Sequence, residues 1–238
     1  MSTTFESRAE AGTSGACRRI LVWDAPVRVL HWLMVLCFAG AWLTAESERW
    51  RLVHVTLGYT MAGLVAFRLL WGLVGTRHAR FASFVRGPRA VARYVGSILR
   101  GRPEHHAGHN PAGAVAIVAL LGFAALVTFS GWATYNELGG RWLEEAHEAI
   151  ATAMLAVIAV HVAGVALGCI VHRENLVASM VHGRKAASPA EGVRKTWRSV
   201  AAVMLAAVLW FWGSQLGGGA VPGPNPKHQG FAHHQHRE

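Results

Sequence analysis

The stretch Leu143–Gly168 reads LEEAHEAIATAMLAVIAVHVAGVALG, and it decides how the rest of the chain is interpreted. As a helix it would extend about 39 Å, which exceeds the ~30 Å of hydrocarbon in a bilayer. Apart from its first residues the stretch is apolar, yet it carries His147 and His161. Ionisable side chains are costly inside a membrane and usually serve a function. These two histidines are therefore the first candidate site residues.

The spacing of the two histidines predicts their relative positions. A separation of fourteen residues advances ~21 Å along a helix and turns it through nearly four full revolutions. His147 and His161 should therefore lie on one face at two depths. This arrangement indicates two sites stacked across the bilayer.

Composition and hydropathy predict an all-α integral membrane protein. Hydrophobic residues make up 53% of the 238 residues and charged residues only 15%, and a soluble helical core would need polar faces that these apolar runs lack. The net charge of +10 indicates contact with a membrane surface rather than with nucleic acid, because the arginines lie between the apolar runs. The five predicted spans are Val27–Ala45, Leu52–Gly75, Pro111–Thr134, Ala146–Val171 and Trp197–Leu216.

The distribution of Lys and Arg predicts the orientation. Most of them lie in the N-terminal segment and in the loops after the second and fourth spans. Because cytoplasmic loops are enriched in positive charge, we expect a cytoplasmic N-terminus and a periplasmic C-terminus. Only five basic residues fall on the other side: Arg49, Arg51, Arg141, Lys227 and Arg237. No signal-peptide pattern precedes Val27, so the first span is expected to remain as an anchor.

Two further histidines match the two predicted depths. His31 lies near the cytoplasmic start of the first span, and His54 lies near the outer start of the second. Depth alone pairs His31 with His161 and His54 with His147. Zinc needs three or four protein ligands, whereas haem iron needs two axial ligands and often takes histidine. The sequence therefore predicts two haem b groups with two histidine ligands each. Packing histidines that hydrogen-bond across helices are the alternative.

Two arginines are candidate partners for haem propionates. Arg68 lies fourteen residues after His54, and hence on the same helix face at the cytoplasmic level, where it is expected to bind a propionate of the inner haem. Arg28 is a second candidate. The alternative for Arg68 is extension of its side chain to the interface. The remaining histidines in or near the cytoplasmic loops are expected to be interfacial or solvated: His78, His105, His106, His109, His172 and His182.

The segments LHW (30–32), VHVTLGY (53–59), AFRLLWG (66–72) and the fourth span with its two histidines resemble the bacterial cytochrome b561 / nickel-hydrogenase b-type cytochrome family. The resemblance covers about residues 20–184. It implies a four-helix core in the cytoplasmic membrane with two bis-histidine b haems, in which His31, His54, His147 and His161 occupy the ligand positions. The fifth span and the histidine-containing tail lie outside this core.

The resemblance and the bis-histidine sites together predict electron transfer. A haem iron with two protein ligands has no open position for oxygen chemistry, so we expect no catalytic residue. The expected partners are membrane quinone and a periplasmic redox protein, either a c-type cytochrome or a hydrogenase-like module, as part of a respiratory chain. The alternatives are a superoxide oxidase that reduces quinone and, less favoured, a histidine-lined metal transporter.

Four segments follow from this interpretation. Residues 1–19 are expected to form a disordered cytoplasmic N-terminus, and residues 20–184 a four-helix cytochrome domain. Residues 185–216 form a linker and the fifth transmembrane helix. Residues 217–238 form a disordered periplasmic tail that contains histidines.

Overall fold

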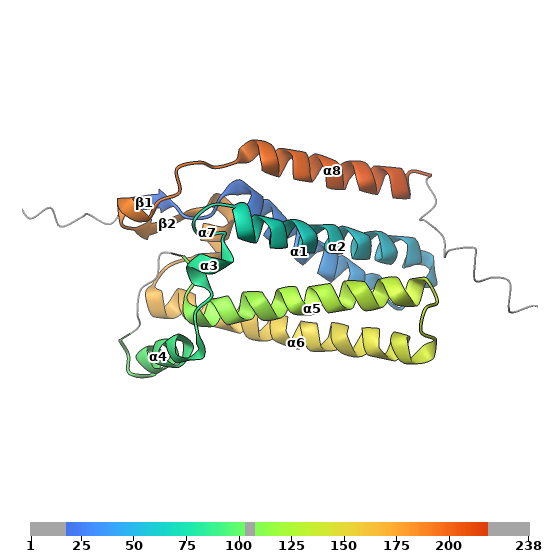
Figure 1. The fold of residues 1–238 in the computed structure, drawn as a ribbon, viewed down its shortest axis with the longest axis horizontal. Helices are drawn as coiled ribbons and strands as arrows, with labels where there is room; N and C mark the ends of the chain where they lie inside the picture. Colours follow the sequence, from blue (N-terminus) through green and yellow to red (C-terminus); the bar gives the residue numbers. More distant parts are fainter. Residues whose placement is uncertain (1–17, 103–107, 219–238) are drawn as a thin grey trace, which may run out of the picture.

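A computed structural model describes residues 18–102 and 108–218. Five long helices run antiparallel along one axis (Figure 1), and each is long and apolar enough to cross a membrane. They are α1 (Ala25–Thr44), α2 (Arg51–Val74), α5 (Pro111–Tyr135), α6 (Arg141–His172) and α8 (Arg198–Leu216). The prediction of an all-α membrane protein with five spans is confirmed.

Short elements gather mainly at one end of the bundle, which we call the sheet end (Figure 1). Strands β1 (Arg18–Leu21) and β2 (Arg184–Ala187) pair there in antiparallel register, with Arg18 opposite Ala187. Arg18 and Arg19 thus belong to the fold rather than to the N-terminal segment. The short helices are η1 (Glu48–Trp50), α3 (Phe81–Phe84), α4 (Pro88–Leu99), α7 (Leu176–His182) and η2 (Pro189–Glu191).

Two N-caps position the helices of the bundle at the sheet end. The side chain of Asp24 accepts a hydrogen bond from the backbone of Val27 at 2.9 Å. It also accepts from the indole of Trp71 at 3.1 Å and from the hydroxyl of Thr76 at 2.7 Å. Asp24 is 1% exposed, so it links the start of α1 to the end of α2. Asn110 caps α5 in the same manner, accepting from Gly113 at 2.7 Å.

Four of the helices form two hairpins, which contact each other mainly through one helix from each hairpin. The first hairpin is α1 with α2, the second is α5 with α6, and α2 packs against α5. Helix α8 lies on α1 and α2. The core lies mostly on α1 and α2, where Leu33, Cys37 and Leu64 are buried. Helix α6 has few buried residues, as expected of a helix whose apolar side chains face lipid.

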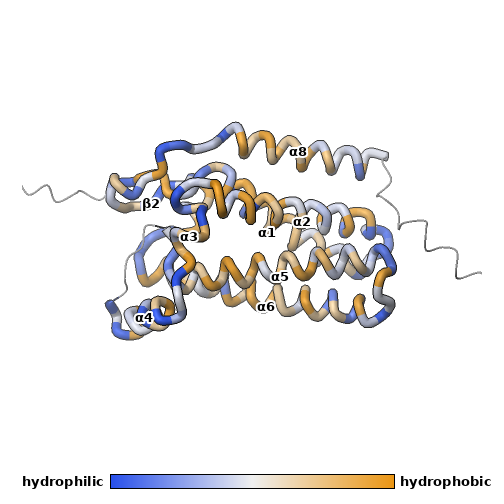
Figure 2. The backbone as a smooth tube through the Cα atoms, in the orientation of Figure 1, coloured by the Kyte–Doolittle hydropathy of each residue, from blue (hydrophilic) through white to orange (hydrophobic). Residues whose placement is uncertain are grey.

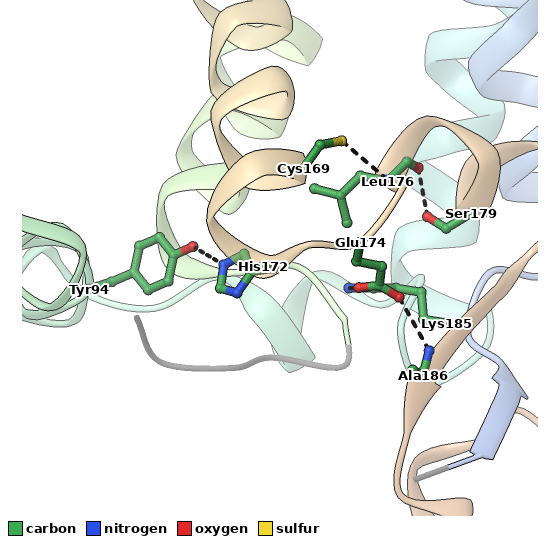
Figure 3. A network of polar contacts seen from close by, with 8 residues as sticks. All are labelled: Tyr94, Cys169, His172, Glu174, Leu176, Ser179, Lys185 and Ala186. Carbon is green, nitrogen blue, oxygen red and sulfur yellow. Dashed lines mark hydrogen bonds and ion pairs between the residues drawn. The ribbon is translucent and has the colours of Figure 1, made fainter. Parts of the chain in front are cut away.

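A polar network closes the sheet end around the last turn of α6 (Figure 3). The Glu174 carboxylate accepts from the backbone of Ala186 at 3.2 Å and forms an ion pair with Lys185 at 3.5 Å. The hydroxyl of Tyr94 lies 3.4 Å from Nε2 of His172. Helix α4 and strand β2 are thereby joined to α6, which fixes the level at which α6 ends.

Candidate functional site: two histidine pairs within the bundle

The structure brings His54 of α2 and His147 of α6 together at the end of the bundle opposite the sheet. Their ring centroids lie 6.3 Å apart and their planes are inclined by 81°. Both side chains are half-buried. Two imidazoles from different hairpins therefore face a shared space at one level.

The tautomer of His54 follows from its hydrogen-bond partner. Nδ1 of His54 lies 2.9 Å from the backbone oxygen of Ala41 on α1. A carbonyl oxygen can only accept, so Nδ1 carries the proton and donates it. In a neutral imidazole this leaves the lone pair of Nε2 available to a metal. His54 is thus prepared to act as a ligand through Nε2.

His147 is held by α5. Its Nδ1 lies 3.0 Å from the hydroxyl of Ser130, which is 4% exposed. The next residue, Gly131, packs against the same ring, because a Cβ placed there would lie 2.9 Å from Cε1 of His147. Sequence analysis missed both residues, since nothing in the sequence shows which face of α5 meets the imidazole.

His31 of α1 and His161 of α6 lie toward the sheet end. Nδ1 of His31 is buried and has no hydrogen-bond partner among the described residues. His31 therefore differs from His54 and His147, whose Nδ1 atoms are both engaged.

Arg68 is buried rather than extended to the surface, with 5% of its area exposed. Its guanidinium donates to the backbone oxygen of Ala79 at 3.1 Å and lies over the ring of Phe81 at 4.8 Å. Arg28 donates to the backbone oxygen of Val181 at 2.7 Å. A guanidinium has five N–H donors, so Arg68 retains donors beyond the bond to Ala79.

His109 packs in the protein instead of lying in a solvated loop as expected. Its ring lies against Trp23, with centroids 4.4 Å apart, and against Phe84 at 4.6 Å. Burial lowers the pKa of His109 to about 3, and the positive charges of Arg68, His78, Lys185 and His161 act in the same direction. His109 is therefore neutral at physiological pH.

Two other loop histidines are also engaged. Nε2 of His78 donates to the backbone oxygen of Glu191 at 2.8 Å, and Nε2 of His182 lies 3.2 Å from the guanidinium of Arg19. Two further loop histidines and the histidines of the C-terminal tail lie outside the described residues: His105, His106, His228, His233, His234 and His236.

Residues 22–183 match the family described as prokaryotic cytochrome b561. The chain belongs to this family. Membership implies haem b as the cofactor, and it confirms the resemblance seen in the sequence. The matched region ends before α8.

Relatives of this cytochrome carry related names. A protein of Escherichia coli (strain K12) named "Probable Ni/Fe-hydrogenase 1 B-type cytochrome subunit" is 28% identical over 142 residues. The match covers 49% of this chain and 60% of that relative. Two further relatives are named "Probable Ni/Fe-hydrogenase B-type cytochrome subunit". The protein of Bradyrhizobium diazoefficiens is 24% identical, and the match covers 70% of this chain and 85% of that relative. The protein of Azotobacter chroococcum is 27% identical, and the match covers 69% of this chain and 87% of that relative. No solved structure matches the chain.

The separation of His54 and His147 fits a haem b held between them. Two metal–imidazole bonds of about 2 Å each, together with the two ring radii, place the ring centroids about 6 Å apart. The 6.3 Å between His54 and His147 agrees with this value. The described residues contain no group of three or more His, Cys, Asp or Glu side chains that could hold a bare metal ion. Two histidines, by contrast, can supply the protein ligands of a haem iron.

Proposed function

We propose that this protein is a dihaem cytochrome b that transfers electrons across the cytoplasmic membrane between the quinone pool and a periplasmic redox partner. In this proposal His54 and His147 ligate the outer haem, and His31 and His161 ligate the inner haem. The observation that carries it is the facing pair of His54 and His147 with the Nε2 lone pair of His54 free. Bound haem supplies reversible one-electron chemistry at the iron.

The chain contributes the ligands and the levels at which they lie. His147 and His161 share one helix, so the rigid α6 fixes the separation of the two levels. Arg68 has donors left beyond its bond to Ala79, and we assign them to a propionate of the inner haem. Arg28 is a weaker candidate for the same role, because it already donates to the backbone oxygens of Val181 and Asp24.

The relatives favour a hydrogenase-like module as the periplasmic partner, because their names describe cytochrome subunits of Ni/Fe-hydrogenases. A superoxide oxidase would need free cations at the outer end to attract an anion. There Arg51 pairs with Glu48 at 3.7 Å and Arg141 with Glu145 at 3.2 Å. These pairs do not favour the alternative.

The test is a haem count on protein purified in detergent. Reduced-minus-oxidised spectra and pyridine haemochromes should give two b haems per chain, and His54→Ala and His161→Ala should each retain one. His172→Ala is the matched control, because His172 lies on the same helix but contacts Tyr94, and it should retain both. Absence of haem, or a count unchanged by the two ligand variants, would contradict the proposal.

The quinone step needs a separate measurement. Addition of a short-chain quinol to the purified protein should reduce the haems, as recorded by the same difference spectrum. If two haems are present but no quinol reduces them, the dihaem site stands and the quinone assignment fails.

A further inference from the structure

The ligand His147 has a hydrogen-bond partner that its inner counterpart His31 lacks. Ser130 of α5 is almost fully buried, and its hydroxyl oxygen lies 3.0 Å from Nδ1 of His147 and 3.1 Å from the backbone oxygen of Val127. Two other positions on α5, one with a hydroxyl group and one a glycine, serve as comparisons. The Thr128 hydroxyl bonds to Ala124 and Ala125 of its own helix, and a Cβ at Gly122 would meet nothing within 4 Å.

The direction of the hydrogen bond follows from the role of His147, and this step rests on the proposed function. A neutral imidazole that ligates iron through Nε2 must carry its proton on Nδ1. The Ser130 hydroxyl oxygen therefore accepts from Nδ1, and the hydroxyl proton is donated to the oxygen of Val127. Successive hydrogen bonds polarise one another, so the carbonyl of Val127 strengthens the bond that Ser130 accepts.

We propose that Ser130 is a positioning residue that orients His147 and lowers the midpoint potential of the outer haem. A hydrogen bond from the second nitrogen of a histidine ligand fixes its ring and makes it a stronger donor to the metal. Stronger donation stabilises the ferric state relative to the ferrous state, and the potential falls. The group on which Ser130 would act is a haem whose iron is bound by two imidazoles.

Gly131 also helps to position the ring of His147. A Cβ there would lie 2.9 Å from Cε1 and 3.3 Å from Nδ1 of His147. Any side chain would push the imidazole away from Ser130 and from the level of His54. Glycine is thus required at this position by the close approach of α5 to the ring, whereas Gly122 on the same helix has open space beside it.

The effect is confined to one of the two haems. Nδ1 of His31 has no partner among the described residues, and the Ser130 hydroxyl bonds to His147 of the outer pair. Removal of the Ser130 hydroxyl should therefore move one potential and leave the other in place. A general loss of stability would not produce this selective result.

The experiment is a spectroelectrochemical titration of the full chain, in detergent, with the electron paramagnetic resonance spectrum of the ferric haems recorded in parallel. Ser130→Ala should retain two haems, shift the potential of one haem to more positive values and change one low-spin signal. Ser130→Thr keeps the hydroxyl and should restore the wild-type potential. Ser130→Val matches threonine in shape, and it should behave as Ser130→Ala. Thr128→Ala is the control and should change nothing.

The glycine is tested by matched alanine substitutions. Gly131→Ala should lose the outer haem or broaden its signal, whereas Gly122→Ala should retain two haems with unchanged potentials. Equal shifts in the threonine and valine variants, or unchanged potentials in all Ser130 variants, would overturn the role of the hydroxyl. The dihaem proposal would survive that result, because it fails only if wild-type protein lacks two haems or if their count is independent of the four histidines.

Discussion

His109 shows how a loop residue becomes part of the interior. It directly precedes the cap of α5, and its ring lies between Trp23 and Phe84. Its Nδ1 is buried without a hydrogen-bond partner among the described residues. A protonated imidazole would be buried close to the charge of Arg68, so the fold favours the neutral form.

This burial predicts a loss of stability in acid. The pKa of His109 is about 3 in the folded protein, against 6.5 for an unperturbed histidine. Between these values the unfolded chain binds a proton that the folded protein does not, so falling pH favours unfolding. The thermal unfolding midpoint in detergent should therefore fall more steeply from pH 7 to pH 5 in wild type than in His109→Phe, which keeps an aromatic ring. Parallel pH profiles would contradict this expectation.

The site residues differ in how far sequence could identify them. The positions of His147 and His161 on one face follow from helical periodicity, and the level of His54 follows from its place at the start of a span. Ser130 and Gly131 could not be identified, because their role depends on the rotation of α5 relative to α6. Thr128, two residues from Ser130, has the same chemistry and bonds only within its own helix.

Among the residues that the structure describes, one polar contact attaches helix α8 to the bundle within the apolar region. The indole of Trp212 donates to the hydroxyl of Thr60 on α2 at 2.9 Å. Thr60 in turn donates to the backbone of Thr56 at 2.7 Å. Such bonds between membrane helices contribute roughly 0.6 kcal/mol on average, so the contact orients α8 more than it stabilises it.

Trp212→Phe should loosen α8 without changing the haem sites. Loss of the bond to Thr60 should increase hydrogen–deuterium exchange in α8, while the haem count stays at two because α8 provides no histidine of either pair. Trp210→Phe is the matched control, since Trp210 is 75% exposed and should leave exchange unchanged. Equal exchange in both variants would show that packing alone holds α8.

The elements were predictable where a single physical property decides them. Length and apolarity define the spans, and α1, α2, α5 and α8 begin and end within two residues of the sequence prediction. The strands carry no comparable signal. Each has four residues, and β1 forms only because a segment far along the chain lies beside it.

The ends of the bundle differ in charge. Hydrophilic segments lie at both ends, with hydrophobic helices between them (Figure 2). The sheet end holds β1, α4 and β2 with their arginines and lysines, whereas the opposite end carries Glu48 of η1 and Glu145 at the start of α6. The asymmetry is a property of the whole chain, because it requires loops from three separate regions to meet.

We expect this asymmetry to place the sheet end in the cytoplasm. Alkaline phosphatase, which is active only in the periplasm, should be active when fused after Leu216 and inactive when fused after Gly183. A green fluorescent protein fused at the same two positions should give the reverse pattern. The opposite result at both positions would show that the chain inserts with its N-terminus outside.

The β1–β2 pair also constrains the order in which the molecule is completed. A ribosome makes Arg18–Leu21 before α1 and makes Arg184–Ala187 only after α1, α2, α5 and α6. Chains are assembled from the N-terminus as synthesis proceeds, so β1 must wait unpaired while α1, α2, α5 and α6 enter the bilayer. The two strands can pair only after these four helices have been made. Pairing of the two strands would therefore report that α1, α2 and α6, the helices that carry the four histidines, have all been made.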